Sequence, residues 1–224
     1  MEQNLSKKTR TESDLIGSRE VPESALYGVQ TLRGIENFRI SKFHLNEYPL
    51  FIQALAITKM GAAVANRELD LLTEEQADAI LKACKEILEG KHHDQFPVDM
   101  IQGGAGTTTN MNANEVIANR ALELMGHQRG EYQYCSPNDH VNRSQSTNDA
   151  YPTAIHIGLY YTHLKLVKHF EVLIESFRKK ATEFAHVIKM GRTQLEDAVP
   201  MTLGQTFNGF ASILRHEVKR SEER

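Results

Sequence analysis

The stretch Pro137–Ala154 reads PNDHVNRSQSTNDAYPTA and leads from a polar segment into a long segment with periodic apolar residues. Within it, Ser146–Asp149 (STND) offers four N-cap residues in a row, although one helix needs only one. One interpretation is a helix cap followed by a polar turn, because these residues are common in turns. The other is an anion site, because a helix N-terminus carries partial positive charge and free N–H donors. The stretch by itself leaves both interpretations open.

A long helix is expected to follow. Between Pro152 and Lys189 the sequence has no further proline and one glycine. The apolar residues recur at steps of three and four, with Thr162 filling the one gap between Leu159 and Leu166: Ile155, Leu159, Leu166, Phe170, Leu173, Phe177, Ala181, Phe184 and Ile188. This is the period of a nearly straight helix, which would span roughly 50 Å and need partners along its length. A second polar loop is expected over Gly191–Leu203, and a second helix from Leu203 onward. We expect such a chain to be the front part of something longer or to assemble with other copies.

The residues before this stretch predict shorter elements. They are a frayed terminus (Met1–Thr11), short strands or turns followed by a helix (Gly28–Phe38), and helices over Pro49–Leu69, Thr73–Gly90 and Asn110–Met125. The predicted fold class is therefore mainly α. Residues 1–139 would form a small N-terminal helical domain, and residues 140–224 the start of a long central helix bundle.

Composition excludes several classes of function. The 224 residues are 40% hydrophobic and 25% charged, as in soluble globular proteins. The net charge of −3 argues against nucleic-acid binding, and the absence of an apolar run of membrane-spanning length argues against a membrane protein. Cys84 and Cys135 cannot build a disulfide framework, so a cytoplasmic location is expected. The only histidine cluster, His92-His93-Asp94, is a poor metal site because adjacent residues do not share a helix face.

Three polar loops precede or interrupt the helices: Gln102–Asn114 (QGGAGTTTNMNAN), Ser144–Asp149 (SQSTND) and Gly191–Asp197 (GRTQLED). The first lacks the GK[ST] ending of a P-loop and does not match GxGxxG, which disfavours nucleotide binding. No serine, cysteine or lysine lies in a nucleophile motif. The loops supply neutral donors that can hold carboxylates and stabilise negative charge on oxygen. Each loop alone could be only a cap or turn, but three of similar chemistry favour a site.

These loops resemble the first two signature regions of the aspartase/fumarase superfamily, whose members eliminate ammonia, water or a larger amine with formation of fumarate. The first region is similar to Gly103–Glu115 (GGAGTTTNMNANE) together with SQSTND, and the second to Gly191–Gln205 (GRTQLEDAVPMTLGQ). Arg19–Ser41, Asp94–Asp99 and Glu123–Tyr134 also resemble family sequence, so the resemblance covers essentially the whole chain.

Within the superfamily, the details are more similar to the ammonia-lyases that act on L-aspartate than to the fumarate hydratases. Fumarases usually carry SSND in place of STND, and a histidine where this chain has Ser136. They also usually carry a histidine where this chain has Gln194, and a neutral amide there cannot titrate. Two alternatives remain: a fumarate hydratase, and a catalytically silent helical-bundle protein like the lens members of the superfamily.

The resemblance also implies roles for six residues. Thr107, Ser146 and Thr147 would hold the carboxylate next to the carbon that loses its proton, and would stabilise the resulting aci-carboxylate. Asn148, Thr193 and Gln194 would hold the amino group and the other carboxylate. The reaction would need no organic cofactor, and activation by a divalent cation is left open.

The third family signature is a mobile glycine-serine loop whose serine is the general base, and this chain has nothing that resembles it. We therefore expect these residues to hold L-aspartate or fumarate but to include no catalytic residue, so that this chain alone is inactive. Intact family members are homotetramers whose sites are built from three subunits through a core of long helices. A homo-oligomer is expected here as well.

Overall fold

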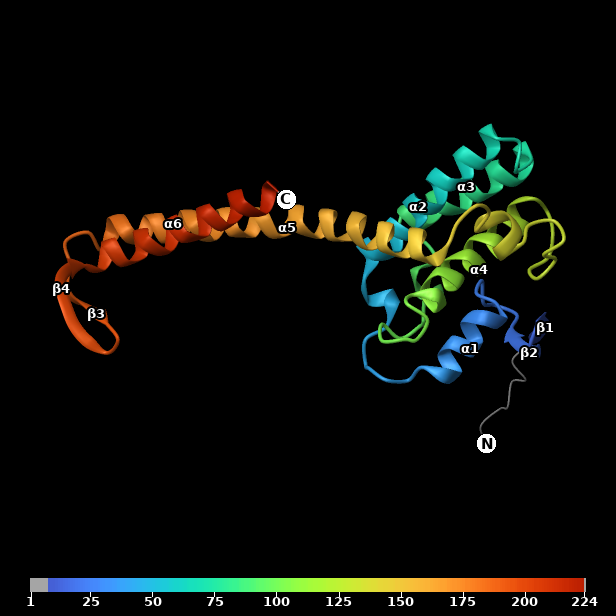
Figure 1. Ribbon diagram of the computed structural model, residues 1–224, viewed down its shortest axis with the longest axis horizontal. Helices are drawn as coiled ribbons and strands as arrows, with labels where there is room; N and C mark the ends of the chain where they lie inside the picture. The colour runs from blue at the N-terminus through green and yellow to red at the C-terminus, as the bar shows by residue number, and fades with distance from the viewer. Residues whose placement is uncertain (1–7, 224) are drawn as a thin grey trace. The chain divides into compact units, whose positions relative to one another are not determined.

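The computed structural model describes residues 8–223 of the chain, and these are mainly helical (Figure 1). The α-helices are α1 (Val29–Asn37), α2 (Pro49–Glu68), α3 (Glu74–Leu88), α4 (Thr107–Leu124), α5 (Thr147–Glu183) and α6 (Leu203–Glu222). Short helical turns form η1 (Leu45–Glu47), η2 (His93–Gln95) and the π-helical η3 (Pro137–Val141). Two antiparallel hairpins pair β1 (Thr9–Asp14) with β2 (Gly17–Pro22), and β3 (Ile188–Thr193) with β4 (Glu196–Thr202). The predicted mainly α fold class is confirmed.

The chain divides into two compact units. The first ends at Leu159 and the second begins at Tyr160, so that α5 contributes residues to both. This division reflects packing and falls later in the chain than the domain boundary predicted after Asp139. The organisation into residues 1–139 and 140–224 therefore remains a prediction.

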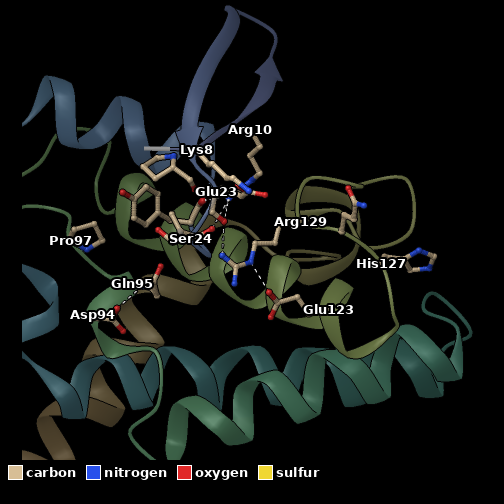
Figure 2. A pocket seen from close by; sticks show the side chains of 14 residues that line it. Lys8, Arg10, Glu23, Ser24, Asp94, Gln95, Pro97, Glu123, His127 and Arg129 are labelled. Carbon is tan, nitrogen blue, oxygen red and sulfur yellow. Dashed lines mark hydrogen bonds and ion pairs between the residues drawn. The ribbon is translucent and has the colours of Figure 1, made fainter. Parts of the chain in front are cut away.

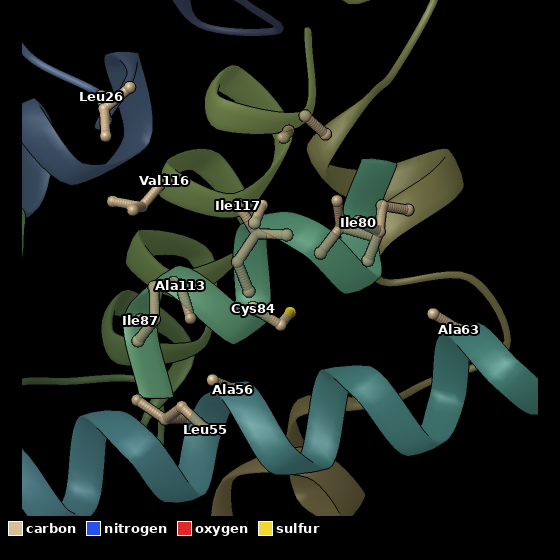
Figure 3. Packing of buried hydrophobic residues seen from close by; sticks show 14 of the residues in the cluster. Leu26, Leu55, Ala56, Ala63, Ile80, Cys84, Ile87, Ala113, Val116 and Ile117 are labelled. Atoms are coloured by element: carbon tan, nitrogen blue, oxygen red, sulfur yellow. The ribbon is translucent and has the colours of Figure 1, made fainter. Parts of the chain in front are cut away.

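The core of the first unit lies between α2, α3 and α4, where alanines alternate with larger aliphatic side chains (Figure 3). Leu55, Ile80 and Ile117 are almost completely buried there. The helix starts follow local rules. Pro49 occupies the first turn of α2, where a missing N–H has no cost. The predicted capping box opens α3, because Thr73 Oγ1 accepts from the Gln76 amide over 3.2 Å.

The predicted frayed terminus is wrong for its described part. Residues 1–7 lie outside the described residues, but Thr9–Asp14 forms strand β1. The hairpin is anchored by Arg10, whose guanidinium donates to the carbonyl oxygens of Ala25 (2.7 Å) and Tyr27 (2.8 Å). Glu12 is buried and accepts from Tyr132 over 2.9 Å. These contacts are made with residues that lie further along the sequence. They fix the structure of a polar segment whose local propensity does not predict a strand.

The long helix and the loop after it also differ from the prediction. Helix α5 starts at Thr147, before Pro152, and ends at Glu183, so Ile188 lies in a strand and is 80% exposed. The predicted polar loop is the β3–β4 hairpin, with Ile188 opposite Thr202. Backbone pairing across the hairpin supplies the hydrogen bonds that a continued helix would have made. The Val187 carbonyl then accepts from the first amide of α6 over 2.8 Å.

In the second unit, aromatic side chains of α5 and of the turn after it pack against α6. The ring of Phe177 lies 5.6 Å from that of Phe210, and Phe184 lies 5.8 Å from Phe207, measured between centroids. A capping box formed by Thr202 and Gln205 starts α6. None of the helices within residues 8–223 is both long and apolar enough to cross a membrane.

Candidate functional site at two helix N-termini

The glycine-containing start of the first polar loop, residues 102–106, lies just before α4 and is held on its N-terminal side by Asp99. This buried carboxylate accepts from the Ile101 amide over 2.7 Å and from the Ser41 amide and hydroxyl over 2.7 Å each. Burial raises the pKa of Asp99, but the hydrogen bonds from Ile101 and Ser41 outweigh it and lower the pKa to about 2. Gln102 then bridges the loop, donating to the Asp99 carbonyl (2.8 Å) and accepting from the Thr109 amide (2.7 Å). The start of α4 is thus fixed in place.

Thr107 is the first residue of α4 and is exposed. Its hydroxyl donates to the Gly104 carbonyl over 2.6 Å. The loop reaches it through Ala105 at φ +50° and Gly106 at φ +90°. Gly106 lies against the ring of Tyr151, since a Cβ at Gly106 would be 2.4 Å from Tyr151 Cγ. The N-termini of α4 and α5 therefore meet.

The turn before α5 combines a helix cap with a contact to the first polar loop. Ser146 is the cap, because its carbonyl accepts from the Ala150 amide (3.0 Å) and its hydroxyl from the Asn148 amide (3.2 Å). Asp149 completes the cap by accepting from the Ser146 amide over 3.3 Å. Thr147 has a different partner: its Oγ1 accepts from Asn110 Nδ2 of α4 over 3.2 Å. One residue of the stretch therefore caps the helix, and the next links the two polar loops.

A buried lysine lies beneath these loops. Lys59 of α2 is fully buried, and its ammonium donates to the side-chain oxygens of Asn110 (2.8 Å), Asn142 (2.9 Å) and Gln145 (2.9 Å). Burial lowers the pKa of Lys59 to about 7. This group was not predicted from the sequence. A signal was present, because Lys59 follows Ile52 and Leu55 at helical spacing on the buried face of α2.

The remaining predicted residues belong to the second unit. Thr193 ends β3 opposite Glu196 and is exposed, as is Gln194 at the tip of the hairpin. Gln194 and Leu195 have φ of +46° and +71°. The structure therefore brings together Thr107, Ser146, Thr147 and Asn148 in the first unit, and places Thr193 and Gln194 in the second.

Backbone strain is concentrated in the three polar loops. Six non-glycine residues among residues 8–223 have positive φ, and four of them lie in these loops: Ala105, Ser144, Gln194 and Leu195. Such conformations cost of order 1–3 kcal/mol each and tend to occur at ligand sites and switch regions. The strain supports a role for the loops beyond connecting helices.

Two other places are weaker candidates. His92 and His93 bond Glu86 (2.8 Å) and the Ile87 carbonyl (2.9 Å), and residues 8–223 contain no group of three or more side chains that could hold a metal ion. A cavity of about 1090 Å³ lies between the β1–β2 hairpin and the end of α4 (Figure 2). Its guanidinium groups are engaged: Arg129 donates to Glu123 (2.6 Å) and the Glu23 carbonyl (2.8 Å). The Arg129 guanidinium is therefore committed to protein acceptors rather than turned toward a ligand.

The converging helix N-termini and their hydroxyl groups can hold carboxylates and stabilise an oxyanion. A family model described as Lyase matches residues 17–224, and the chain belongs to this family, the aspartase/fumarase superfamily. Among curated relatives, it is 56% identical over 216 residues to an aspartate ammonia-lyase of Escherichia coli (strain K12), covering 96% of this chain and 45% of the relative. The chain thus spans about half the length of the curated relatives it matches.

Comparison with solved structures also finds lyases of this family. The chain superposes with a TM-score of 0.92 and 52% identity on a fumarate lyase:delta crystallin from Brucella melitensis, covering 96% of this chain and 50% of that one. For a class II fumarase from Schistosoma mansoni, the TM-score is 0.84 and the identity 38%, covering 95% of this chain and 44% of the fumarase. The helical fold is therefore shared across the family.

Proposed function

We propose that the whole protein to which this chain corresponds eliminates ammonia reversibly from L-aspartate to give fumarate. The observation that carries the proposal is the hydrogen bond from Asn110 to Thr147, which joins the first two polar loops at two helix N-termini. The 56% identity to an aspartate ammonia-lyase supports this substrate over others of the family.

The chemistry requires stabilisation of a carbanion. A base removes a proton from the carbon beside one carboxylate, and the electron pair spreads onto that carboxylate as an aci-carboxylate. The pair then returns to form the carbon–carbon double bond as the C–N bond breaks and ammonia leaves. Thr107, Ser146 and Thr147 are proposed to donate to the aci-carboxylate oxygens, where donors lower the barrier most. Thr107 would do so in exchange for its present hydrogen bond to the Gly104 carbonyl.

Asn148, Thr193 and Gln194 are proposed to bind the amino group and the other carboxylate. Their exposure leaves them accessible to a small ligand. Gln194 can donate and accept hydrogen bonds without changing charge, which suits a binding role rather than proton transfer. We place the general base in the part of the relatives that this chain does not span, and we propose no organic cofactor.

The whole protein is also proposed to form a homotetramer. The support is the apolar surface of the second unit, where Tyr160, Leu166, Val172 and Ile213 are between 49% and 68% exposed. Such surface on a helix pair is commonly covered by further helices.

The test is fumarate absorbance with L-aspartate and L-malate supplied in parallel, and circular dichroism as the check on folding. The assay uses this chain and a protein extended to the length of its relatives. We expect the extended protein to convert L-aspartate and not L-malate, and the shorter chain to fold without activity. Turnover of L-malate instead would identify a hydratase, and a folded extended protein inactive on both would favour a structural protein.

A further inference from the structure

The ammonium group of Lys59 has three N–H donors, and three amide oxygens receive them. The acceptors are Asn110 Oδ1 (2.8 Å), Asn142 Oδ1 (2.9 Å) and Gln145 Oε1 (2.9 Å). Lys59 is fully buried and Asn110 is 1% exposed. A buried charge held only by neutral groups is costly, and a methionine of similar length would avoid that cost. The residue therefore calls for an explanation beyond packing.

The lysine decides which way the Asn110 amide faces. The protonated lysine can donate but cannot accept, so while Lys59 is charged Asn110 turns its oxygen toward it. The amide nitrogen then faces the other way, where it donates to Asn142 Oδ1 (3.1 Å) and Thr147 Oγ1 (3.2 Å). Thr147 Oγ1 is the acceptor of this hydrogen bond, so its own O–H proton points away from Asn110 and can be donated to another group.

The same lysine fixes the turn that carries Thr147. Asn142 donates to the Gln145 carbonyl (3.1 Å), and Gln145 donates to the Val141 carbonyl (2.9 Å). Both side chains accept from Lys59, so the turn is tied to α2 at two points. Ser144 lies between them at φ +59°, a conformation that needs such support.

We propose that Lys59 is a positioning residue that, through Asn110, directs the Thr147 hydroxyl to donate outward to the substrate carboxylate. The role rests on the proposed elimination reaction, since it defines what the hydroxyl donates to. Lys59 itself touches no substrate and transfers no proton.

The deciding variant is Asn110→Asp in the protein extended to the length of its relatives. An aspartate keeps an oxygen for Lys59 and gives the lysine a charged partner, which offsets the lost hydrogen bond to Asn142 Oδ1, so the protein should still fold. It has no N–H for Thr147, whose hydroxyl would now donate inward to the carboxylate. We expect kcat for L-aspartate to fall by about 10²-fold, as when one oxyanion donor is lost, with a smaller change in KM. A folded Asn110→Asp protein with unchanged kcat would overturn the proposal.

The second variant is Lys59→Met, with Lys82→Met as the matched control because Lys82 is exposed on α3. Lys59→Met should lower kcat and speed amide hydrogen exchange at residues 145–148, whereas Lys82→Met should do neither. If Lys59→Met does not fold, kcat of Asn110→Asp decides. If the unaltered protein converts no L-aspartate, the proposed function fails. The positioning role of Lys59 is then tested by hydrogen exchange alone. Exchange at residues 145–148 that is the same in Lys59→Met and in the unaltered protein would overturn that role.

Discussion

Gly106 and Tyr151 are in direct contact, with the glycine α-carbon facing the tyrosine ring. A Cβ on Gly106 would lie 2.4 Å from Tyr151 Cγ. This contact brings the N-terminus of α4 against the first turns of α5, and the two hydroxyl-bearing loops meet as a result. The candidate site in the first unit therefore depends on a position with no room for a side chain.

Gly106→Ala is expected to destabilise the chain by about 2–4 kcal/mol, because it adds a steric clash to the cost of alanine at φ +90°. Thermal unfolding followed by circular dichroism measures the change. Gly126→Ala is the matched control, because Gly126 has φ +84° and a Cβ added there would have no neighbouring atom within 4 Å. Equal losses in the two variants would mean that the Tyr151 contact contributes nothing.

Glu115→Gln is expected to destabilise the first unit by about 1–3 kcal/mol. Glu115 is buried and accepts from the amides of Gly28 (2.8 Å), Gln30 (2.8 Å) and Thr31 (3.0 Å), so it replaces the missing side-chain cap of α1. An amide would turn one acceptor oxygen into a donor facing N–H groups. Chemical denaturation tests this, with exposed Glu75→Gln as the control. A Glu115→Gln midpoint equal to that of the control would contradict the capping role.

The ion pair between Glu86 and Arg120 is expected to weaken in acid. Arg120 donates to both carboxylate oxygens (2.6 and 2.8 Å) and, with His92, holds the pKa of Glu86 at about 2. Because the unfolded value is about 4.3, this stabilisation is present above that pH and is lost as the pH falls toward 2. Glu86→Gln should therefore lower the unfolding free energy at pH 6 and do so much less near pH 2. A difference that does not change with pH would contradict this.

Thr193→Val is expected to reduce the turnover of L-aspartate by the extended protein severely, with little loss of stability. Thr193 is exposed at the end of β3, so the methyl group replaces a hydroxyl without disturbing a core. Steady-state kinetics and a melting curve give the two readouts. Thr182→Val, at an exposed threonine of α5, serves as the control. Near-normal rates for Thr193→Val would remove it from the proposed site.

The chain is expected to self-associate through the second unit, where Val172 is 68% and Ile213 62% exposed. Sedimentation velocity at several concentrations should show species larger than 25.3 kDa. Replacing Val172 and Ile213 by lysine should shift the distribution toward the monomer. A clean, well-folded monomer of the unaltered chain would refute the expectation.

Local signals in the sequence were sufficient for most helices. Pro49, the Thr73 capping box and the glycine after α4 are read within a few residues, and the structure confirms the elements they predict. The β3–β4 hairpin was not predicted, because strand pairing depends on a partner strand rather than on a local period. The chemical similarity of the polar loops was predicted from the sequence. Their backbone geometry was not predicted.

The sequence by itself determined the family, the mainly α fold and the identity of the hydroxyl groups in the loops, because periodicity, caps and motifs are local properties of the chain. Tertiary structure alone decided how those hydroxyls are held. Lys59 reaches Asn110, Asn142 and Gln145 across 51, 83 and 86 residues of sequence. A lysine in an apolar helix pattern does not specify its acceptors, since only folding brings them within hydrogen-bonding distance.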